Sequence, residues 1–155
     1  DFDVNLNIGY LDASYDEFEE DAPGGSVIDR SGENFEAIPE WNVSIGVQYN
    51  GQAALGDWFA RVDYAWQDEV DLSPVDRFNV GAEQNSQDSY GLLNARFQLT
   101  IDRWDADVSL FGSNLTNEEY KVYVVDLINQ LGFRAASPGI PRTYGISFTK
   151  RFGNF

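Results

Sequence analysis

Apolar and polar residues alternate with a period of two along six stretches of the chain, which is typical of β-strands with one apolar and one polar face. In the first stretch, Phe2 and Val4 lie on one side and Asp3 lies on the other. The remaining stretches repeat this arrangement. The pattern therefore predicts six strands, at residues 2–10, 41–50, 58–67, 93–101, 104–113 and 142–152.

The connections between these stretches alternate in length. Segments 11–40, 68–89 and 116–141 are long, whereas segments 51–57 and 102–103 are short. An antiparallel up-and-down meander with long loops at one end and tight turns at the other is typical of an outer-membrane β-barrel, whose long loops are extracellular. Each stretch has about 9–11 residues, the length that a tilted strand needs to cross a bilayer. We therefore expect an all-β chain that forms six strands of a transmembrane barrel.

The two faces of these strands differ in charge as well as in polarity. The polar side of the strands carries charged residues, among them Arg61, Asp63, Arg96, Asp105 and Asp107. Moving an arginine to the opposite side would cost about 2–4 kcal/mol at the middle of a bilayer. Lys150 is the exception, and it lies near a strand end, where a long side chain can reach the headgroups. The alternation therefore predicts lipid at the apolar side and a polar lumen at the other.

Two neighbouring carboxylates on one strand could indicate acid–base chemistry. Asp105 and Asp107 point the same way on the expected 104–113 strand, into the polar lumen. Solvation, or pairing with Arg96 and Arg61 on that face, explains both carboxylates without catalysis. We therefore assign no catalytic residue to the chain and expect it not to be an enzyme.

Aromatic residues collect at the two ends of the apolar face. With the long connections outside the cell, the extracellular group consists of Tyr10, Trp41, Trp66 and Tyr144. The periplasmic group consists of Tyr49, Trp58, Trp104 and Phe152. Amphipathic rings are enriched where they meet lipid headgroups, so the two groups are interpreted as girdles at the lipid interfaces. Tyr90 and Phe111 do not fit this scheme.

Composition excludes several classes of function. The chain has 26 Asp and Glu against 10 Lys and Arg, and its net charge of −16 excludes nucleic acid as a partner, because that partner requires a basic surface. It has no Cys and no His, which excludes disulfides, thiolate or imidazole metal sites and a Ser-His-Asp triad within these residues. No apolar run reaches the roughly 18 residues of a membrane-spanning helix. We predict no metal site and no cofactor.

The first long connection is strongly acidic. Its only basic residue is Arg30, and its acidic residues are Asp12, Asp16, Glu17, Glu19, Glu20, Asp21, Asp29, Glu33, Glu36 and Glu40. Two interpretations remain open. The connection could capture Ca²⁺, another cation or a cationic ligand, because hard oxygen ligands suit hard ions. Otherwise it is a solvated loop, or a loop bridged by divalent ions to lipopolysaccharide. No spacing in it matches an EF-hand.

Six strands are too few for a closed membrane barrel, since barrels of this type start at about eight strands. An open sheet would leave two unpaired edges in lipid, which a bilayer does not tolerate. The chain also contains no Met, and residues 1–6 already alternate like the middle of a strand. We therefore expect that further strands precede Asp1. A small complete domain is the alternative.

Five segments, taken together in order and spacing, resemble the C-terminal end of the TonB-dependent receptors. They are 7–15 (NIGYLDASY), 38–41 (IPEW), 90–96 (YGLLNAR), 114–120 (NLTNEEY) and 138–145 (PGIPRTYG). The resemblance covers nearly the whole chain. It implies that residues 1–155 are the last six strands of a barrel of about 22 strands, with an N-terminal plug and energy supplied through the TonB complex. It also implies a C-terminal aromatic signal for the barrel-assembly machinery, at either Phe152 or Phe155.

These observations lead to one main functional hypothesis, an outer-membrane receptor that actively imports a large scarce solute such as a siderophore-type metal chelate. Segment 116–141 is the expected binding loop, with Tyr120, Tyr123, Phe133 and Arg134 as substrate contacts. Outer-membrane lipids and lipopolysaccharide are further expected partners. The alternatives are a soluble carbohydrate-binding β-sandwich and an outer-membrane enzyme, and the lack of His counts against the enzyme.

Overall fold

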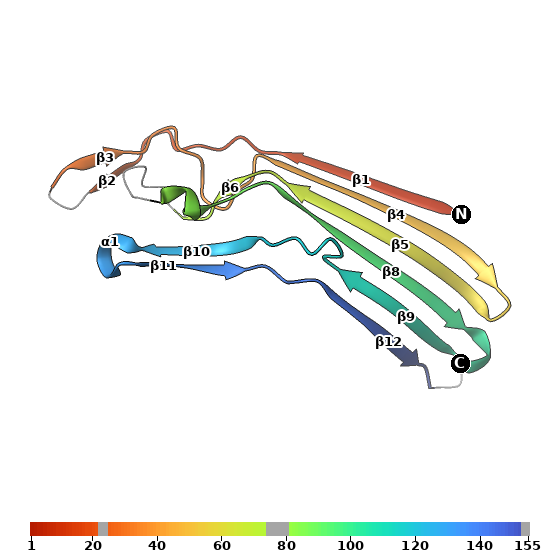
Figure 1. Ribbon diagram of the computed structural model, residues 1–155. Coiled ribbons are helices and arrows are strands. Elements are labelled where there is room, and N and C mark those ends of the chain that lie inside the picture. The colour runs from red at the N-terminus through yellow and green to blue at the C-terminus, as the bar shows by residue number, and fades with distance from the viewer. Residues whose placement is uncertain (22–24, 74–80, 153–155) are drawn as a thin grey trace.

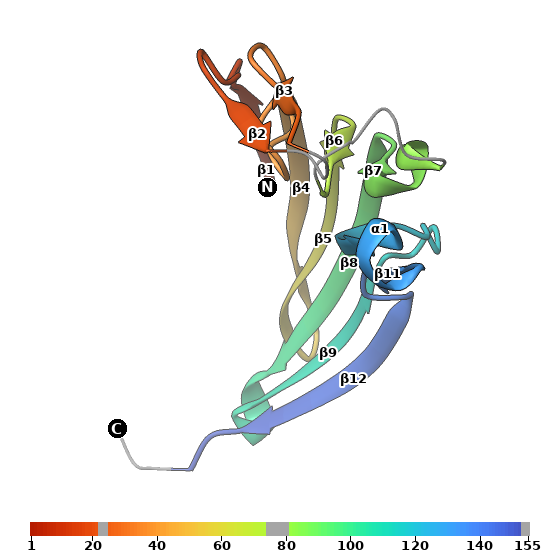
Figure 2. The same cartoon turned by 90° about the vertical axis from the view of Figure 1, so that its left-hand side faces the viewer.

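Six long strands form one antiparallel sheet in the computed structural model, which describes residues 1–21, 25–73 and 81–152 (Figure 1). The strands are β1 (Phe2–Tyr10), β4 (Trp41–Ala53), β5 (Gly56–Gln67), β8 (Tyr90–Ile101), β9 (Ala106–Ser113) and β12 (Thr143–Lys150). Their order in the sheet is their order in the chain, so the predicted up-and-down meander is confirmed. Figure 2 shows that the sheet is curved and that β1 and β12 do not close it into a barrel.

The strand register confirms the predicted alternation of faces. Val62 of β5 lies opposite Val47 of β4 and Ala95 of β8, whereas the adjacent Asp63 lies opposite Gly46 and Asn94. The apolar face is open, since side chains such as Leu6 and Ile146 are 59% and 70% exposed. No second sheet packs against it in the ranges that the structure describes, as a β-sandwich would require. An apolar surface of this extent indicates contact with lipid or another protein.

Side-chain hydrogen bonds on the sheet's polar face run both along and across the strands. Arg61 donates to both carboxylate oxygens of Asp63, at 2.9 and 2.5 Å, and to Asn5 Oδ1 at 3.1 Å. The ends of these three side chains lie over Gly46, where a Cβ atom would be 2.4–2.6 Å from them. The lack of a side chain at Gly46 therefore makes room for this group.

Of the two explanations expected for Asp105 and Asp107, pairing with Arg96 and Arg61 is wrong, whereas solvation agrees with the 54% exposure of the Asp105 side chain. Both carboxylates contact Arg151, which follows the last strand, and Asp107 also accepts a hydrogen bond of 2.9 Å from Thr100. Arg96 instead donates to Gln98 and Ser109. Spacing along one strand could not reveal this, because Arg151 reaches Asp107 only once β12 pairs with β9.

The turn end of the sheet also differs from the predicted boundaries. Residues Asp102–Trp104 form a 3₁₀ turn, η2, and Asp105 is left-handed with φ 46°, so Trp104 does not lie on a strand as predicted. The β4–β5 connection is shorter than predicted, because the two strands continue to Ala53 and from Gly56. Gly56 has φ 140°, and a Cβ there would lie 2.1 Å from the Thr100 carbonyl oxygen, so the tight turn requires glycine.

Rings at the turn end touch one another across the strands. Phe2 contacts Tyr49 at a centroid distance of 4.7 Å, Tyr49 contacts Trp58 at 5.5 Å, and Trp58 contacts Phe97 at 5.7 Å. At the loop end, Tyr10 and Trp41 lie directly opposite and are 4.6 Å apart. These contacts place the rings in two bands on one face, and their role at lipid headgroups stays a prediction.

The remaining predicted girdle residues lie at the same two ends. Trp66 and Tyr144 belong to the loop ends of β5 and β12. Trp104 lies in the turn itself, and Phe152 follows β12 with 87% of its surface exposed. Lys150 donates to the Trp104 carbonyl and lies 5.7 Å from the Phe152 ring centroid, so its side chain reaches the strand end as expected. Phe155 lies outside the described residues.

The two aromatic residues that did not fit the girdles have specific neighbours. Tyr90 begins β8 and stacks on Tyr120 with a centroid distance of 4.4 Å and an interplanar angle of 21°. Phe111 lies on β9 opposite Gly145, where a Cβ would be 2.6 Å from its ring. Tyr90 therefore belongs to the base of a long connection, and Phe111 fills the space that Gly145 leaves.

Each long connection contains a short two-stranded sheet that the sequence pattern did not predict. The additional elements are β2 (Glu19–Asp21), β3 (Val27–Asp29), β6 (Val70–Asp71), η1 (Ala82–Asn85), β7 (Ser86–Gln87), β10 (Lys121–Leu127), α1 (Ile128–Leu131) and β11 (Phe133–Pro138). A cluster of buried apolar residues lies among them rather than in the large sheet, and it consists of Val70, Leu72 and Val124. No helix among the described residues is long and apolar enough to span a membrane.

Candidate functional site

All three long connections emerge at one end of the sheet, opposite the tight turns (Figure 1). Of the two-stranded sheets in these connections, the β10–β11 hairpin has the longest strands, and α1 forms its tip. Its strands pair from Lys121 opposite Pro138 to Leu127 opposite Phe133, with an irregularity between Lys121 and Tyr123. Connecting segments can vary without disturbing the strand ladder, so this end is where binding groups are expected.

The two faces of the hairpin have different surroundings. Val124 is only 2% exposed and packs with Val70 and Leu72 of the β5–β8 connection. On the other face, Tyr123 is 59% exposed and Phe133 is 47% exposed. Period-two alternation separates these sets, since Val124 follows Tyr123 directly. The hairpin therefore presents an aromatic face to the surroundings and an apolar face to its neighbour.

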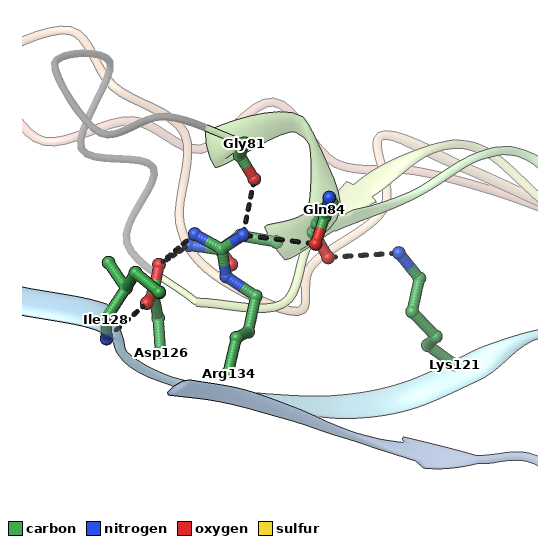
Figure 3. Close-up of polar contacts among 7 residues, drawn as sticks. Gly81, Gln84, Lys121, Asp126, Ile128 and Arg134 are labelled. Carbon is green, nitrogen blue, oxygen red and sulfur yellow. Dashed lines mark hydrogen bonds and ion pairs between the residues drawn. The ribbon is translucent and has the colours of Figure 1, made fainter. Parts of the chain in front are cut away.

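Arg134 lies on the packed side of the hairpin and is held by several groups (Figure 3). Its Nη2 donates to Asp126 Oδ2 at 2.7 Å, and its Nη1 donates to the Gly81 carbonyl at 2.6 Å and to Gln84 Oε1 at 3.3 Å. The Asn85 amide also donates to Asp126 Oδ2, at 2.7 Å. The Arg134 and Asp126 side chains are only 11% and 10% exposed. We call these five residues the Arg134 cluster.

The electrostatics of the Arg134 cluster favour the ionised pair. The hydrogen bond from Arg134 lowers the pKa of Asp126 below its usual range, and donations from Asn85 and the Ile128 amide act in the same direction. Burial opposes this shift, because it disfavours a charged carboxylate. The carboxylate is therefore fully ionised at neutral pH and remains paired with the guanidinium.

Lys121 makes a second set of contacts near the base of the same hairpin. Its ammonium group donates to the carbonyl oxygen of Gln84 at 3.1 Å and to that of Ser86. Its backbone amide donates to Gln87 Oε1 at 2.8 Å. The hairpin thus contacts the β5–β8 connection at both of its ends.

The base of the third connection is organised by Asn114. This residue is 3% exposed and left-handed, with φ 51°. Its amide group donates to the carbonyls of Glu118 at 2.8 Å and Ile140 at 3.1 Å, and its Oδ1 accepts from the Glu118 amide at 2.8 Å. Asn114 therefore joins the beginning of the connection to its end, which explains an asparagine at the start of the NLTNEEY segment.

A cleft of about 420 Å³ lies beside this base. It is lined by Gln87, residues 117–121, Pro138, Gly139 and Pro141. Tyr120 lies on its wall, between the stacked Tyr90 and the chain at Gly139, where a Cβ would be 2.0 Å from the tyrosine ring. The close approach of ring and backbone shows that Tyr120 is a packed residue with one side at the cleft.

The acidic connection 11–40 folds around its only basic residue. Arg30 is 4% exposed and pairs with Glu20 at 2.5 Å and with Glu33 at 3.2 Å. Tyr15 packs on Phe18 and Phe35, with centroid distances of 4.8 and 4.5 Å. The connection therefore has a small core of its own, and most of its other carboxylates face solvent.

An acidic cleft of about 250 Å³ lies between the first and second long connections. Five carboxylate residues line it: Asp12, Glu40, Asp68, Glu69 and Asp71. The apolar residues Leu11, Phe35, Ile38 and Val70 line the rest of its wall, together with Ala13, Asn34 and Ser86. Within the described ranges, no three carboxylates converge as metal ligands would. The cleft thus carries strong negative charge without the geometry of a bound ion.

The structure divides the four predicted substrate contacts into two pairs. Tyr123 and Phe133 lie on the exposed face of one hairpin, as a contact surface requires. Tyr120 and Arg134 are engaged in packing and in the ion pair with Asp126. Spacing alone could not separate these pairs, because Gly81 and Gln84, two of the partners of Arg134, lie in another connection. Their role in binding stays a prediction.

The organising roles of Lys121, Asp126 and Asn114 were not predicted from the sequence. In the sequence, Asn114 stood out only as the first residue of the NLTNEEY segment that resembles the TonB-dependent receptors. Its buried position at the base of the connection explains why asparagine is found there. Lys121 and Asp126 had no local signal, since their contacts join segments more than 30 residues apart in the chain. The run of β-branched and aromatic residues at 122–125 was the available local indication that a strand crosses this connection.

Comparison with known proteins agrees with this fold. The family described as TonB dependent receptor-like, beta-barrel, matches residues 1–148. Among solved structures, the ferric yersiniabactin uptake receptor FyuA from Yersinia pestis matches with a TM-score of 0.64 and 16% sequence identity, over 77% of this chain and 18% of that one. No curated protein sequence matches. The chain therefore spans less than a fifth of the length of the solved receptor it matches, and that likeness is one of fold.

Proposed function

Because this chain belongs to the TonB-dependent receptor β-barrel family, we propose that residues 1–155 form the C-terminal segment of the barrel domain of an outer-membrane import receptor. The family is one of outer-membrane receptors and not an enzyme class. The open apolar face of the sheet supports this proposal, because such a face suits contact with lipid, and the unpaired edges of β1 and β12 could pair with further strands of a barrel. Upstream strands, a plug domain and the TonB complex would be the partners of such a segment.

We infer that the imported solute is a large scarce compound of the siderophore type. The exposed aromatic face of the β10–β11 hairpin, with Tyr123 and Phe133, carries this inference. Flat rings offer a large contact area for aromatic or chelated groups at a small entropic cost. The solved receptor of similar fold is named for uptake of ferric yersiniabactin, which supports an iron-bound solute for this chain as well.

The experiment is iron uptake by cells that carry the full-length receptor with the double substitution Tyr123→Ala and Phe133→Ala. Radioactive iron would be supplied as a panel of ferric chelates. We expect uptake to fall by roughly tenfold or more, because two central aromatic contacts each contribute on the order of 1–2 kcal/mol. The packed face with Val124 is untouched, so the hairpin should stay folded.

The matched control is Leu131→Ala with Ile140→Ala, which removes two side chains of the same connection that are each 67% exposed. Leu131 lies in α1 and Ile140 follows β11, so neither belongs to the face with Tyr123. Equal uptake losses in both double variants would show that general damage to the connection, and not the aromatic face, explains the result. Normal uptake of every chelate by the Tyr123/Phe133 variant would reject the aromatic face as the contact surface.

A second candidate solute is a cationic compound, and the acidic cleft favours it. The test is the triple substitution Asp12→Asn, Glu40→Gln and Glu69→Gln in the full-length receptor. The control is Glu17→Gln, Glu19→Gln and Asp21→Asn, which removes the same charge from residues that do not line the cleft. Loss of uptake of a cationic solute with the cleft variant alone would favour this candidate, and loss with both variants would indicate long-range attraction.

The end of the chain supports a further partner, the barrel-assembly machinery. Phe152 is 87% exposed beyond β12, with Lys150 beside its ring. We propose Phe152 as the recognised aromatic, while Phe155 lies outside the described residues. Phe152→Ala should lower the amount of assembled receptor in outer-membrane fractions, whereas an unchanged amount would transfer the role to another residue. Lipopolysaccharide remains a proposed partner of the acidic connection 11–40.

A further inference from the structure

Two connections that are distant in the chain share one buried core at the loop end. Val124 of β10 packs with Val70 and Leu72, which follow β5, and all three are at most 8% exposed. The Leu72 amide donates to the Asn85 carbonyl at 2.8 Å, which ties segment 70–73 to η1. Apolar contact therefore joins the β10–β11 hairpin to segments 70–73 and 81–87.

The Arg134 cluster joins the same parts with charged groups. Asp126 and Arg134 both belong to the hairpin, but Gly81 and Gln84 accept from Arg134, and Asn85 donates to Asp126 (Figure 3). Separating the hairpin from segment 81–87 would leave a buried guanidinium without two of its acceptors. Such a group is costly to desolvate unless its hydrogen bonds are kept, so the contact resists opening.

Lys121 holds the other end of the hairpin to the same segment. Its ammonium group donates to the carbonyls of Gln84 and Ser86, and its amide donates to Gln87. Lys121 lies opposite Pro138, whereas Arg134 lies opposite Asp126 nearer the tip. Two contacts at different points along the hairpin hold it against separation from segment 81–87 and against rotation about either contact.

We propose that the β10–β11 hairpin and segment 81–87 form a single mechanical unit, in which Lys121 and Arg134 are positioning residues. A displacement of the hairpin then displaces segment 81–87, so a contact made on the Tyr123 and Phe133 face is transmitted to the connection between β5 and β8. The coupling depends only on contacts within the chain. It therefore does not depend on which solute the receptor carries, or on whether the proposed import function is correct.

The test is hydrogen exchange of the full-length receptor in detergent, measured by mass spectrometry without any solute. We expect Arg134→Met to raise amide exchange by roughly tenfold in peptides from both 121–138 and 81–87, because loss of a buried pair releases both partners. Arg142→Met is the matched control, since Arg142 is an exposed arginine near the start of β12. This control should leave both peptides unchanged.

A second variant keeps the ion pair intact. Lys121→Met removes the donations to the carbonyls of Gln84 and Ser86 but retains the aliphatic stem. We expect a smaller rise that again appears in both peptides. A rise confined to 121–138 in both variants would overturn the proposal, because the two segments would then move separately. Unchanged exchange with both variants would also overturn it, since the polar contacts would not hold the segments together.

Discussion

The large sheet and the β10–β11 hairpin are both antiparallel, but different interactions stabilise them. In the sheet, the backbone ladder and polar cross-strand bonds hold the strands, while the apolar face stays open. In the hairpin, one face is buried against another connection through Val124 and the Arg134 cluster. Apart from ring contacts between its strands, the apolar face of the sheet is therefore left uncovered by this chain, whereas the hairpin buries one face against the same chain.

This difference has consequences for substitutions. A residue on the open face of the sheet has few specific neighbours, so the medium around it decides the effect of a change. A residue in the hairpin core has defined partners, so its effect depends on those partners. The stability of the sheet should therefore depend more on the polarity than on the shape of a substituted side chain. The stability of the hairpin should depend on whether individual hydrogen bonds are kept.

The largest expected effect is a charge placed on the open face of the sheet. Val62→Arg in the full-length receptor should destabilise the barrel by about 2–4 kcal/mol, because a charged side chain near the bilayer centre loses its hydration. Ser44→Arg on the polar face of β4 is the control and should have a much smaller effect. Unfolding by urea in lipid vesicles measures both. Equal losses of stability would show that the two faces do not differ in environment.

The second effect compares a turn of the sheet with the tip of the hairpin. Gly56→Ala should cost about 1–3 kcal/mol from backbone strain alone, and more because of the contact with the Thr100 carbonyl. Gly132→Ala has the same requirement for a positive φ, at 76°, but nothing lies within 4 Å of its added Cβ. It should therefore cost only about 1 kcal/mol. Thermal unfolding of both variants should rank them in this order, and a reversed ranking would contradict the tight packing of the sheet turn.

The third effect is a pH dependence confined to the hairpin. The pKa of Asp126 is lowered by Arg134, so its stabilising contribution is present above the unfolded-state pKa and lost as the pH falls through the folded-state pKa. Protection factors of amides in 121–138 should be constant from neutral pH to about 5 and fall only below about pH 4. Asp126→Asn should remove this dependence. A loss of protection already near pH 6 would mean that another group controls the hairpin.

The smallest expected effect is on cysteine labelling. It should leave stability unchanged and distinguish only the two faces of one strand. Ser147 and Phe148 are neighbours on β12, and they lie opposite Ser109 and Val108 of β9. Phe148→Cys should resist a water-soluble maleimide in membranes, because its face is the one predicted to contact lipid. Ser147→Cys should react wherever the lumen is accessible to the reagent. Reaction of Phe148→Cys at the same rate would reverse the assignment of faces.

The strands of the large sheet were predictable because the polarity of each residue indicates the face of the strand on which it lies. Alternation between Val62 and Asp63, or between Phe148 and Thr149, needs no partner to be recognised. The predictions were wrong at Trp104, where a 3₁₀ turn interrupts a continuing pattern. They were also wrong for the partners of Asp105 and Asp107, because Arg151 reaches them only after the last strand has paired.

The hairpin was predictable only in part. Tyr123 and Phe133 were correctly placed in one connection, and the structure adds that they share its exposed face. The position of Arg134 on the opposite face followed from the pairing with β10, which the sequence pattern did not show. Lys121 had no distinguishing feature in the sequence, since its acceptors are backbone carbonyls of a remote segment.

The sequence by itself determined the strands, their meander order and the sidedness of the sheet, because a period of two in polarity is a local property of the chain. It also determined the excess of acidic residues in the first connection. Only the tertiary structure decided that Arg134 pairs with Asp126 against segment 81–87, and that five carboxylate residues line one cleft. The reason is physical: these contacts join segments distant in the chain, and their geometry exists only after the long strands have set the connections side by side.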